Sequence, residues 1–239
     1  MSTRSPKKKK GNNNLYYIVG AVVALVVAGA LIAVSLAGGD GTDKAVDEAT
    51  ITAIQENTEG IPAEGLVLGD PDAPVTITEY SDVACIHCRT AAIESIPDVV
   101  SQLVRTGQAK LEYAPTAFIS ASSERGALGV LAAAEMDAAW PFAEAIFHIQ
   151  GSASTDWLSD EDMEGIVEQL GLDVDTWREA YQSADIEQRF IESRDAVTSA
   201  GVQSTPTFVV TGPGGTERIE GAVPAATIVQ AVEQVSTPS

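Results

Sequence analysis

The chain has 239 residues, an apolar fraction of 45% and a formal net charge of −20. These values are typical of one or two globular domains. Five basic residues lie before residue 11, so the rest of the chain carries 34 acidic residues against nine basic ones. A surface this acidic repels nucleic acid and anionic lipid, which excludes nucleic acid as a partner of that part.

The first predicted element is a membrane-spanning helix at residues 15–37. Residues 15–36 read LYYIVGAVVALVVAGALIAVSL and carry no charge. At about 1.5 Å per residue, such a helix covers the roughly 30 Å core of a bilayer. Lys7 to Lys10 precede it and predict a cytoplasmic tail at residues 1–14, with the remainder outside the cytoplasmic membrane. A cleavable signal peptide is the alternative, although its apolar region is shorter, at about 7–15 residues.

A polar segment at residues 38–64 is rich in Gly, Asp and Glu and is predicted to be a linker with one helical turn. The folded domain is then expected to begin at residue 65. Its first predicted strand, Val75–Tyr80, is rich in β-branched and aromatic residues. Apolar residues at helical spacing predict a helix that is kinked at Pro97, and a second strand follows at residues 110–114.

A long helix-forming region follows, with predicted breaks near Pro141, at Gly151–Thr155 and near Gly171. Two short strands are then predicted around a hairpin loop at Gly212–Gly215, and an amphipathic helix closes the chain. The order strand, helix, strand, helical block, hairpin, helix indicates an α/β domain. This domain is predicted to span residues 65–239, with a helical insertion at about 120–200.

The stretch SDVACIHCRT contains both cysteines of the chain, Cys85 and Cys88. Disulfides persist outside the cytoplasm, but a bridge across two residues closes a tiny loop, for which the entropic stabilisation is smallest. A structural zinc site needs four ligands, and only His87 and the distant His148 could join the two sulfurs. The sequence therefore favours a redox-active pair, with no metal and no cofactor.

The predicted position of Cys85 at a helix N-terminus suits a thiolate, because unpaired N–H groups and the helix dipole favour an anion there. Thiols at such positions have a pKa below the usual value of about 8.5. His87 can add an N–H donor or a positive charge. Cys88 lies one turn further along the helix and faces inward, which predicts the protected, resolving sulfur of the pair.

A second motif, STPTFVV, places Pro206 directly before a predicted strand. A strand start tolerates proline, which has no N–H for the ladder. A cis Thr205–Pro206 bond would expose the Thr205 backbone for pairing with an extended substrate. With a CxxC motif upstream, this motif strengthens the redox hypothesis.

The segments EYSDVACIHC and GVQSTPTFVV, with a helical block between them, resemble the DsbA-type thiol:disulfide oxidoreductases of the thioredoxin fold, and above all their membrane-tethered extracytoplasmic members. The resemblance covers about residues 65–235. It implies that Cys85 is the exposed nucleophile, Cys88 its partner and Pro206 a cis-proline that faces them. It also implies that Glu79 is the buried acid that transfers protons; an exposed strand glutamate is the alternative.

One departure from this family lies between the two cysteines. Oxidising members usually carry Pro-His there, and this chain has Ile86-His87. The resemblance implies oxidation of cysteine pairs in exported proteins, and reoxidation by a quinone-linked membrane partner of the DsbB or VKOR type. A reductase or isomerase on the same fold is one alternative, and a redox-quiet binding module is another.

Overall fold

The computed structural model describes residues 45–152 and 156–238. The predicted cytoplasmic tail, the predicted membrane helix at residues 15–37 and the first part of the predicted linker lie outside these residues. Within the described ranges, no helix is both long enough and apolar enough to cross a bilayer.

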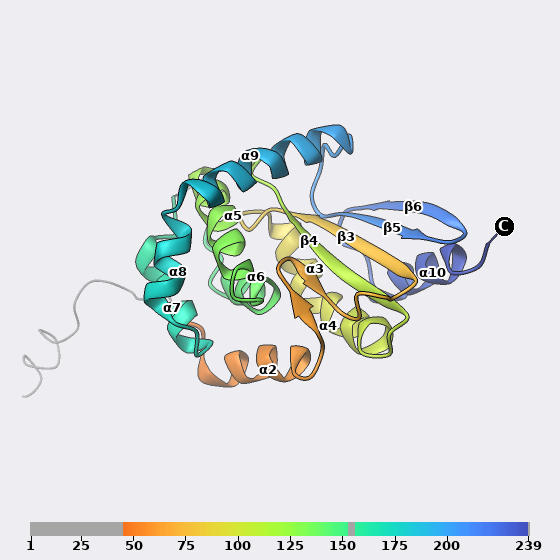
Figure 1. The fold of residues 1–239 in the computed structure, drawn as a ribbon, viewed down its shortest axis with the longest axis horizontal. Coiled ribbons are helices and arrows are strands. Elements are labelled where there is room, and N and C mark those ends of the chain that lie inside the picture. The colour runs from red at the N-terminus through yellow and green to blue at the C-terminus, as the bar shows by residue number, and fades with distance from the viewer. Residues whose placement is uncertain (1–44, 153–155, 239) are drawn as a thin grey trace, which may run out of the picture. The chain divides into compact units, whose positions relative to one another are not determined.

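A mixed six-stranded sheet lies at the centre of the domain, in the order β1-β2-β4-β3-β5-β6 (Figure 1). Its strands are β1 (Ala63–Glu64), β2 (Val67–Leu68), β3 (Val75–Ser81), β4 (Ala109–Pro115), β5 (Thr207–Gly212) and β6 (Gly215–Glu220). β3 and β4 are parallel, and every other neighbouring pair is antiparallel. The carboxyl ends of the two central strands therefore meet at one edge of the sheet, and β3 continues there into the segment with the cysteines.

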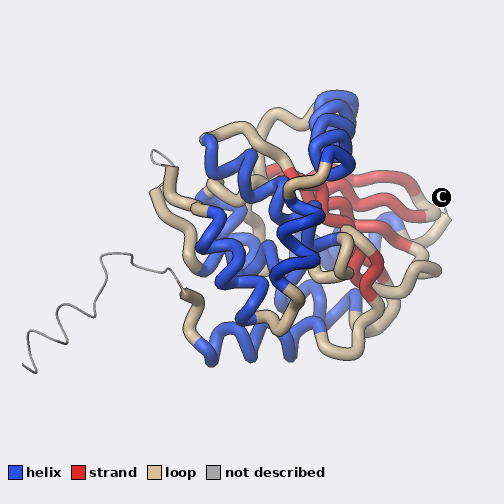
Figure 2. Tube along the Cα trace, turned by 60° about the vertical axis from the view of Figure 1, so that its left-hand side comes forward, coloured by secondary structure: helices blue, strands red, loops and turns tan. Residues whose placement is uncertain are grey.

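Ten helical segments surround or extend this sheet in the described residues. They are α2 (Glu48–Thr58), α3 (Ile86–Glu94), α4 (Ile96–Val99), the π-helix η1 (Val100–Val104), α5 (Ala121–Ala134), α6 (Ala139–His148), α7 (Asp160–Gln169), α8 (Val174–Tyr181), α9 (Ala184–Ser199) and α10 (Ala225–Val235). Helices α5 to α9 form the insertion between β4 and β5, where they pack against one another beside the sheet (Figure 2). The predicted α/β fold with a helical insertion is thus confirmed.

The segment after the cysteines shows the predicted interruption at Pro97. α3 ends at Glu94, and α4 begins at Ile96 with the proline in its first turn. Proline has no N–H to donate to the preceding turn, so the continuous helix is broken here. The break predicted near Pro141 lies just before this proline, between α5, which ends at Ala134, and α6, which begins at Ala139 and carries Pro141 in its first turn. The first N–H groups of a helix have no intrahelical acceptor, so proline is tolerated there.

Part of the predicted linker belongs to the folded domain. Instead of a single turn, residues 48–58 form the three-turn helix α2, whose N-cap Asp47 accepts a hydrogen bond from the backbone of Thr50. Ile51 and Ile54 of this helix are buried. The apolar contacts explain why the segment is ordered despite its polar composition, since tertiary packing supplies most of the stability of a short helix.

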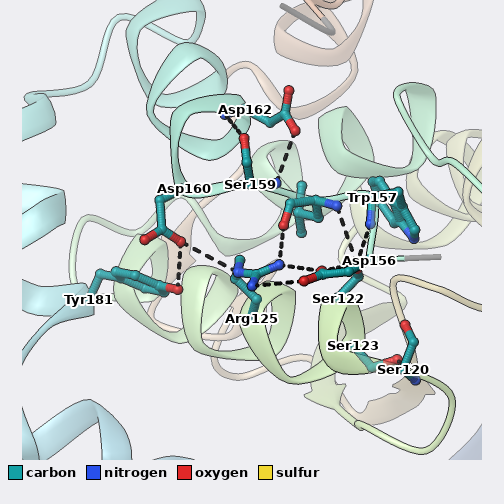
Figure 3. Close-up of polar contacts among 11 residues, drawn as sticks. Ser120, Ser122, Ser123, Arg125, Asp156, Trp157, Ser159, Asp160, Asp162 and Tyr181 are labelled. Carbon is teal, nitrogen blue, oxygen red and sulfur yellow. Dashed lines mark hydrogen bonds and ion pairs between the residues drawn. The ribbon is translucent and has the colours of Figure 1, made fainter. Parts of the chain in front are cut away.

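A polar network ties the segment after residue 155 to α5 (Figure 3). The buried Ser122 hydroxyl accepts hydrogen bonds from the backbone N–H groups of Trp157 at 2.9 Å and Leu158 at 3.2 Å. It donates to Asp156 Oδ1 at 3.1 Å, and Arg125 pairs with the same oxygen at 2.6 Å. The network thereby fixes the start of α7 against α5.

We expect Ser122→Ala to lower the free energy of unfolding by about 2 kcal/mol, because two buried N–H groups lose their acceptor. The urea midpoint, measured on the full chain in detergent, checks this. Ser101→Ala is the control: the Ser101 hydroxyl of η1 is exposed and donates to the carbonyl of Asp98 in the adjoining α4, so we expect a change below about 0.5 kcal/mol. Equal midpoints for the two variants would contradict the prediction.

Candidate active site

The two cysteine side chains lie at the start of α3, immediately after the carboxyl end of β3. Cys85 is the N-cap residue of this helix, and its carbonyl accepts the N–H of Arg89 at 3.0 Å. Both thiols are free. Cys85 is 7% exposed and Cys88 is fully buried. The structure therefore places Cys85 at a helix N-terminus and Cys88 on the inner side, where the sequence analysis expected them.

Two side chains that the sequence analysis missed hold the loop between β3 and α3. The buried Asp82 carboxylate accepts hydrogen bonds from the backbone of Ala84 at 2.9 Å and of Phe118 at 2.8 Å. Gln150, which follows α6, donates to the carbonyls of Val83 at 2.6 Å and Cys85 at 3.1 Å. The loop is thus fixed both to the end of β4 and to the helical insertion.

The surroundings of Cys85 favour its thiolate. They lower the pKa of this thiol from 9.0 to about 5, and the largest cause is a hydrogen bond from the Cys88 thiol. Burial opposes the shift, while the Thr205 side chain and the backbone N–H groups of Cys88 and His87 add to it. At neutral pH the Cys85 sulfur is therefore an anion, as a helix N-terminus favours.

Cys88 has the opposite character. Burial raises the pKa of its thiol far above the usual value, and the neighbouring Cys85 raises it further. The backbone N–H of Asp82 lies 3.4 Å from its sulfur and opposes this shift. The pair therefore consists of a thiolate at the helix N-terminus, 7% exposed, and a protonated thiol that is fully enclosed.

The STPTFVV segment lies against the reactive sulfur. The Thr205–Pro206 peptide bond is cis, and Cys85 Sγ lies 3.3 Å from the carbonyl oxygen of Thr205. β5 begins at the next residue and pairs with β3. The structure thus brings Cys85, Cys88, Thr205 and Pro206 together. The side chain of His87 is exposed, and its effect on Cys85 through a side-chain charge stays a prediction.

Glu79 lies beneath this centre, on β3, where it is paired with Tyr113 of β4 and Phe208 of β5. Its side chain is 1% exposed, so the alternative of an exposed strand glutamate is wrong. Burial raises the pKa of Glu79 to about 7, and the Ser81 hydroxyl partly opposes the rise. An acid with this pKa can accept or release a proton near neutral pH.

A thiolate and an enclosed thiol on a thioredoxin-like α/β fold define a centre for thiol:disulfide exchange. A family model described as Thioredoxin matches residues 63–234. The chain therefore belongs to the thioredoxin family, as a DsbA-type thiol:disulfide oxidoreductase.

The curated relatives that this chain matches include proteins named for disulfide bond formation. A probable disulfide bond formation protein D from Bacillus anthracis is 26% identical over 149 residues, which cover 61% of this chain and 69% of that protein. Disulfide bond formation protein D from Bacillus subtilis is 25% identical over 154 residues, which cover 60% and 66%. The crystal structure of oxidised BdbD from Bacillus subtilis has a similar fold, with a TM-score of 0.64 and 21% identity over 71% of this chain and 91% of that one.

Proposed function

We propose that this chain oxidises cysteine pairs in exported proteins, on the outer side of the cytoplasmic membrane to which residues 15–37 tether it. The observation that carries the proposal is the contrast within the pair: the pKa of Cys85 is lowered to about 5, while that of Cys88 is raised. A disulfide whose reduced form holds a stable thiolate is a strong oxidant. The names of the two curated relatives support the same direction.

The reaction starts from a Cys85–Cys88 disulfide. A substrate thiolate attacks Cys85 Sγ, the bond between the two cysteines breaks, and Cys88 leaves as a thiolate that takes up a proton from Glu79. A second substrate thiolate then attacks the substrate sulfur of this mixed disulfide, and Cys85 leaves as its stable thiolate. The substrate gains a disulfide, and its two electrons remain on the enzyme cysteines. A thiol of low pKa is a fast leaving group, so the second step is favoured.

Exposed apolar side chains beside Cys85 favour an unfolded polypeptide as substrate. Ile86 follows Cys85 directly and is 57% exposed, and Phe118 is 52% exposed while its backbone is bonded to Asp82 of the same loop. An extended chain can place apolar side chains on these groups while its backbone lies along Thr205. Reoxidation of the reduced pair then falls to a quinone-linked membrane partner of the DsbB or VKOR type.

Redox-dependent stability tests the direction of electron flow. Closing the Cys85–Cys88 loop constrains the unfolded chain and favours the oxidised protein by about 2 kcal/mol. The low pKa of Cys85 favours the reduced protein by about 1.36 kcal/mol per pH unit above the folded pKa, hence by about 2.7 kcal/mol at pH 7. We therefore expect the reduced chain to be the more stable form at pH 7.

The pH dependence of this difference follows from the sign of the pKa shift. Because the folded pKa of Cys85 is depressed, its contribution is complete above the unfolded value and is lost as the pH falls through about 5. At pH 4 only the loop term remains, so we expect the oxidised form to be the more stable by about 2 kcal/mol. Urea melts of both redox forms of the full chain in detergent measure this reversal. A clearly more stable oxidised form at pH 7 would favour the reductase or isomerase alternative.

A further inference from the structure

A group of buried polar atoms lies between Cys88 and the interior of the sheet. Glu79 Oε1, Ser81 Oγ and the Tyr113 hydroxyl are buried and make no hydrogen bond of normal geometry in the described residues. Ser81 is near enough to lower the pKa of both Glu79 and Cys88. The charges of Glu79 and Cys88 in turn raise the pKa of Tyr113, whose shift is mainly due to burial. These groups form a polar cluster beneath the enclosed thiol.

A cavity of about 10 Å³ adjoins this cluster. Its volume is close to the smallest that holds one water molecule, and a buried water usually needs two to four polar partners. Two carboxylates, Glu79 of β3 and Glu144 of α6, contribute to its wall together with Tyr113. Apolar side chains of α3, α4 and α6 make up the rest. The cavity therefore joins two acids that come from different layers of the fold.

Glu144 differs from the other members of this group because its side chain is partly exposed. The other members are almost completely enclosed: the exposed fraction is at most 2% for Cys88, Ser81, Glu79 and Tyr113. A proton released by Cys88 therefore cannot pass from these residues directly to bulk water.

Glu144 forms no ion pair in the described residues, so its carboxyl group can take up and release a proton. Burial is the cause that raises the pKa of Glu144 to about 7, close to that of Glu79. Arg89 of α3 donates from its Nε to the carbonyl of Phe147, a residue of the cavity wall, at 3.0 Å. His148 lies one turn after Glu144 on α6, and burial and the charge of Arg89 lower its pKa. In the described residues no ion pair joins Glu144 to a cation. The two acids therefore have matched proton affinities, which suits transfer in either direction.

We propose that Glu144 is the outer member of a proton route that leads from Cys88 through Glu79 and one water in the cavity to solvent. The inference rests on the proposed function, since the route is used whenever the reduced pair is oxidised. With glutathione disulfide as oxidant, the Cys85 thiolate attacks one sulfur and releases a glutathione thiolate. Cys88 then gives its proton to Glu79 and attacks Cys85 Sγ, and the second glutathione thiolate leaves. Glu79 passes the proton through the water to Glu144, and the two electrons end on glutathione.

The test separates these two steps by rapid mixing of the reduced full chain, in detergent, with glutathione disulfide. Acid-quenched samples report the mixed disulfide and the final Cys85–Cys88 disulfide. In Glu144→Gln we expect formation of the mixed disulfide to stay within twofold of the unmodified chain, and its resolution to slow about tenfold at pH 7. Glu144→Asp keeps a carboxyl group and should recover most of the rate. Glu179→Gln, at an exposed glutamate of α8, is the matched control and should change neither step.

Rescue by a small buffer distinguishes proton transfer from a structural role. Imidazole added to Glu144→Ala should speed resolution in proportion to its concentration, while the unmodified chain responds little. Unchanged resolution in Glu144→Gln would overturn the route, as would an equal slowing of both steps that imidazole does not relieve. Neither result touches the proposed function, because oxidation of a reduced, unfolded substrate by the unmodified chain is measured separately.

Discussion

Cys88→Ser is expected to accumulate mixed disulfides with exported proteins, whereas Cys85→Ser is expected to accumulate none and to lose all exchange activity. Cys85 is the thiolate at the start of α3 and is 7% exposed, whereas Cys88 is fully buried behind it. In Cys88→Ser the Cys85 thiolate attacks a disulfide already present in an exported protein and expels one of its two sulfurs as a thiolate. Without Cys88, no partner sulfur can then attack Cys85 to release the joined protein. Without Cys85, the remaining thiol is enclosed and protonated, so no substrate sulfur reaches it.

The measurement is a non-reducing gel of cells that are quenched with acid and alkylated, with the full-length variants expressed at equal levels. The double variant Cys85→Ser/Cys88→Ser is the control for non-specific adducts. A second readout is the pH dependence of Cys85 alkylation in Cys88→Ala, which removes the hydrogen-bond donor that a serine hydroxyl would keep. Because the Cys88 thiol is the largest cause of the low Cys85 pKa, we expect that pKa to rise in the variant. Equal trapping by Cys88→Ser and Cys85→Ser would refute the assigned roles.

The sequence contained enough to locate the reacting atoms but not the groups that support them. The spacing of Cys85 and Cys88 after a β-branched strand predicts a strand, a turn and a helix N-terminus, and the structure has this arrangement. The alternation of apolar and polar residues along β3 also predicts that the side chain of Glu79 is buried. This residue lies in register with Val75 and Ile77 on the fully buried face of the strand, so a period of two predicts its burial.

Contacts between distant segments account for most of what the sequence analysis missed. Gln150 lies 65 residues from Cys85, whose carbonyl it contacts, and no local pattern marks such a partner. The start of the domain is similar: Gln169 of α7 donates to the carbonyl of Val46 at 2.6 Å and accepts its N–H at 3.2 Å. Such bonds fix α2 on the insertion although only two of its residues, Ile51 and Ile54, are buried. Glu144 was missed for the same reason, since its role depends on a cavity shared with β3.

The substitution Glu79→Gln is expected to change the free energy of unfolding of the reduced chain differently at two pH values. The change should be more stabilising at pH 8 than at pH 4, by about 3 kcal/mol. The folded pKa of Glu79 is raised from 4.5 to about 7 because the side chain is buried. For a raised pKa, the favourable contribution of the neutral acid is fully present below about 4.5 and is lost as the pH rises through about 7. About 2.5 pH units at 1.36 kcal/mol each give the expected size.

The difference between the stability changes at pH 4 and pH 8 reports the ionisation of Glu79 alone. A buried glutamine amide needs partners of its own, and any cost of leaving it unpaired is the same at pH 4 and pH 8, so it cancels in the difference. Urea melts of the reduced full chain at both pH values give the two free energies, with Glu217→Gln, at an exposed glutamate of β6, as the control. Parallel pH profiles for Glu79→Gln and the unmodified chain would show that Glu79 ionises like an ordinary carboxyl group. If instead the variant gains stability at pH 8 and resolves mixed disulfides more slowly, Glu79 is retained at a cost in stability because the reaction needs its proton.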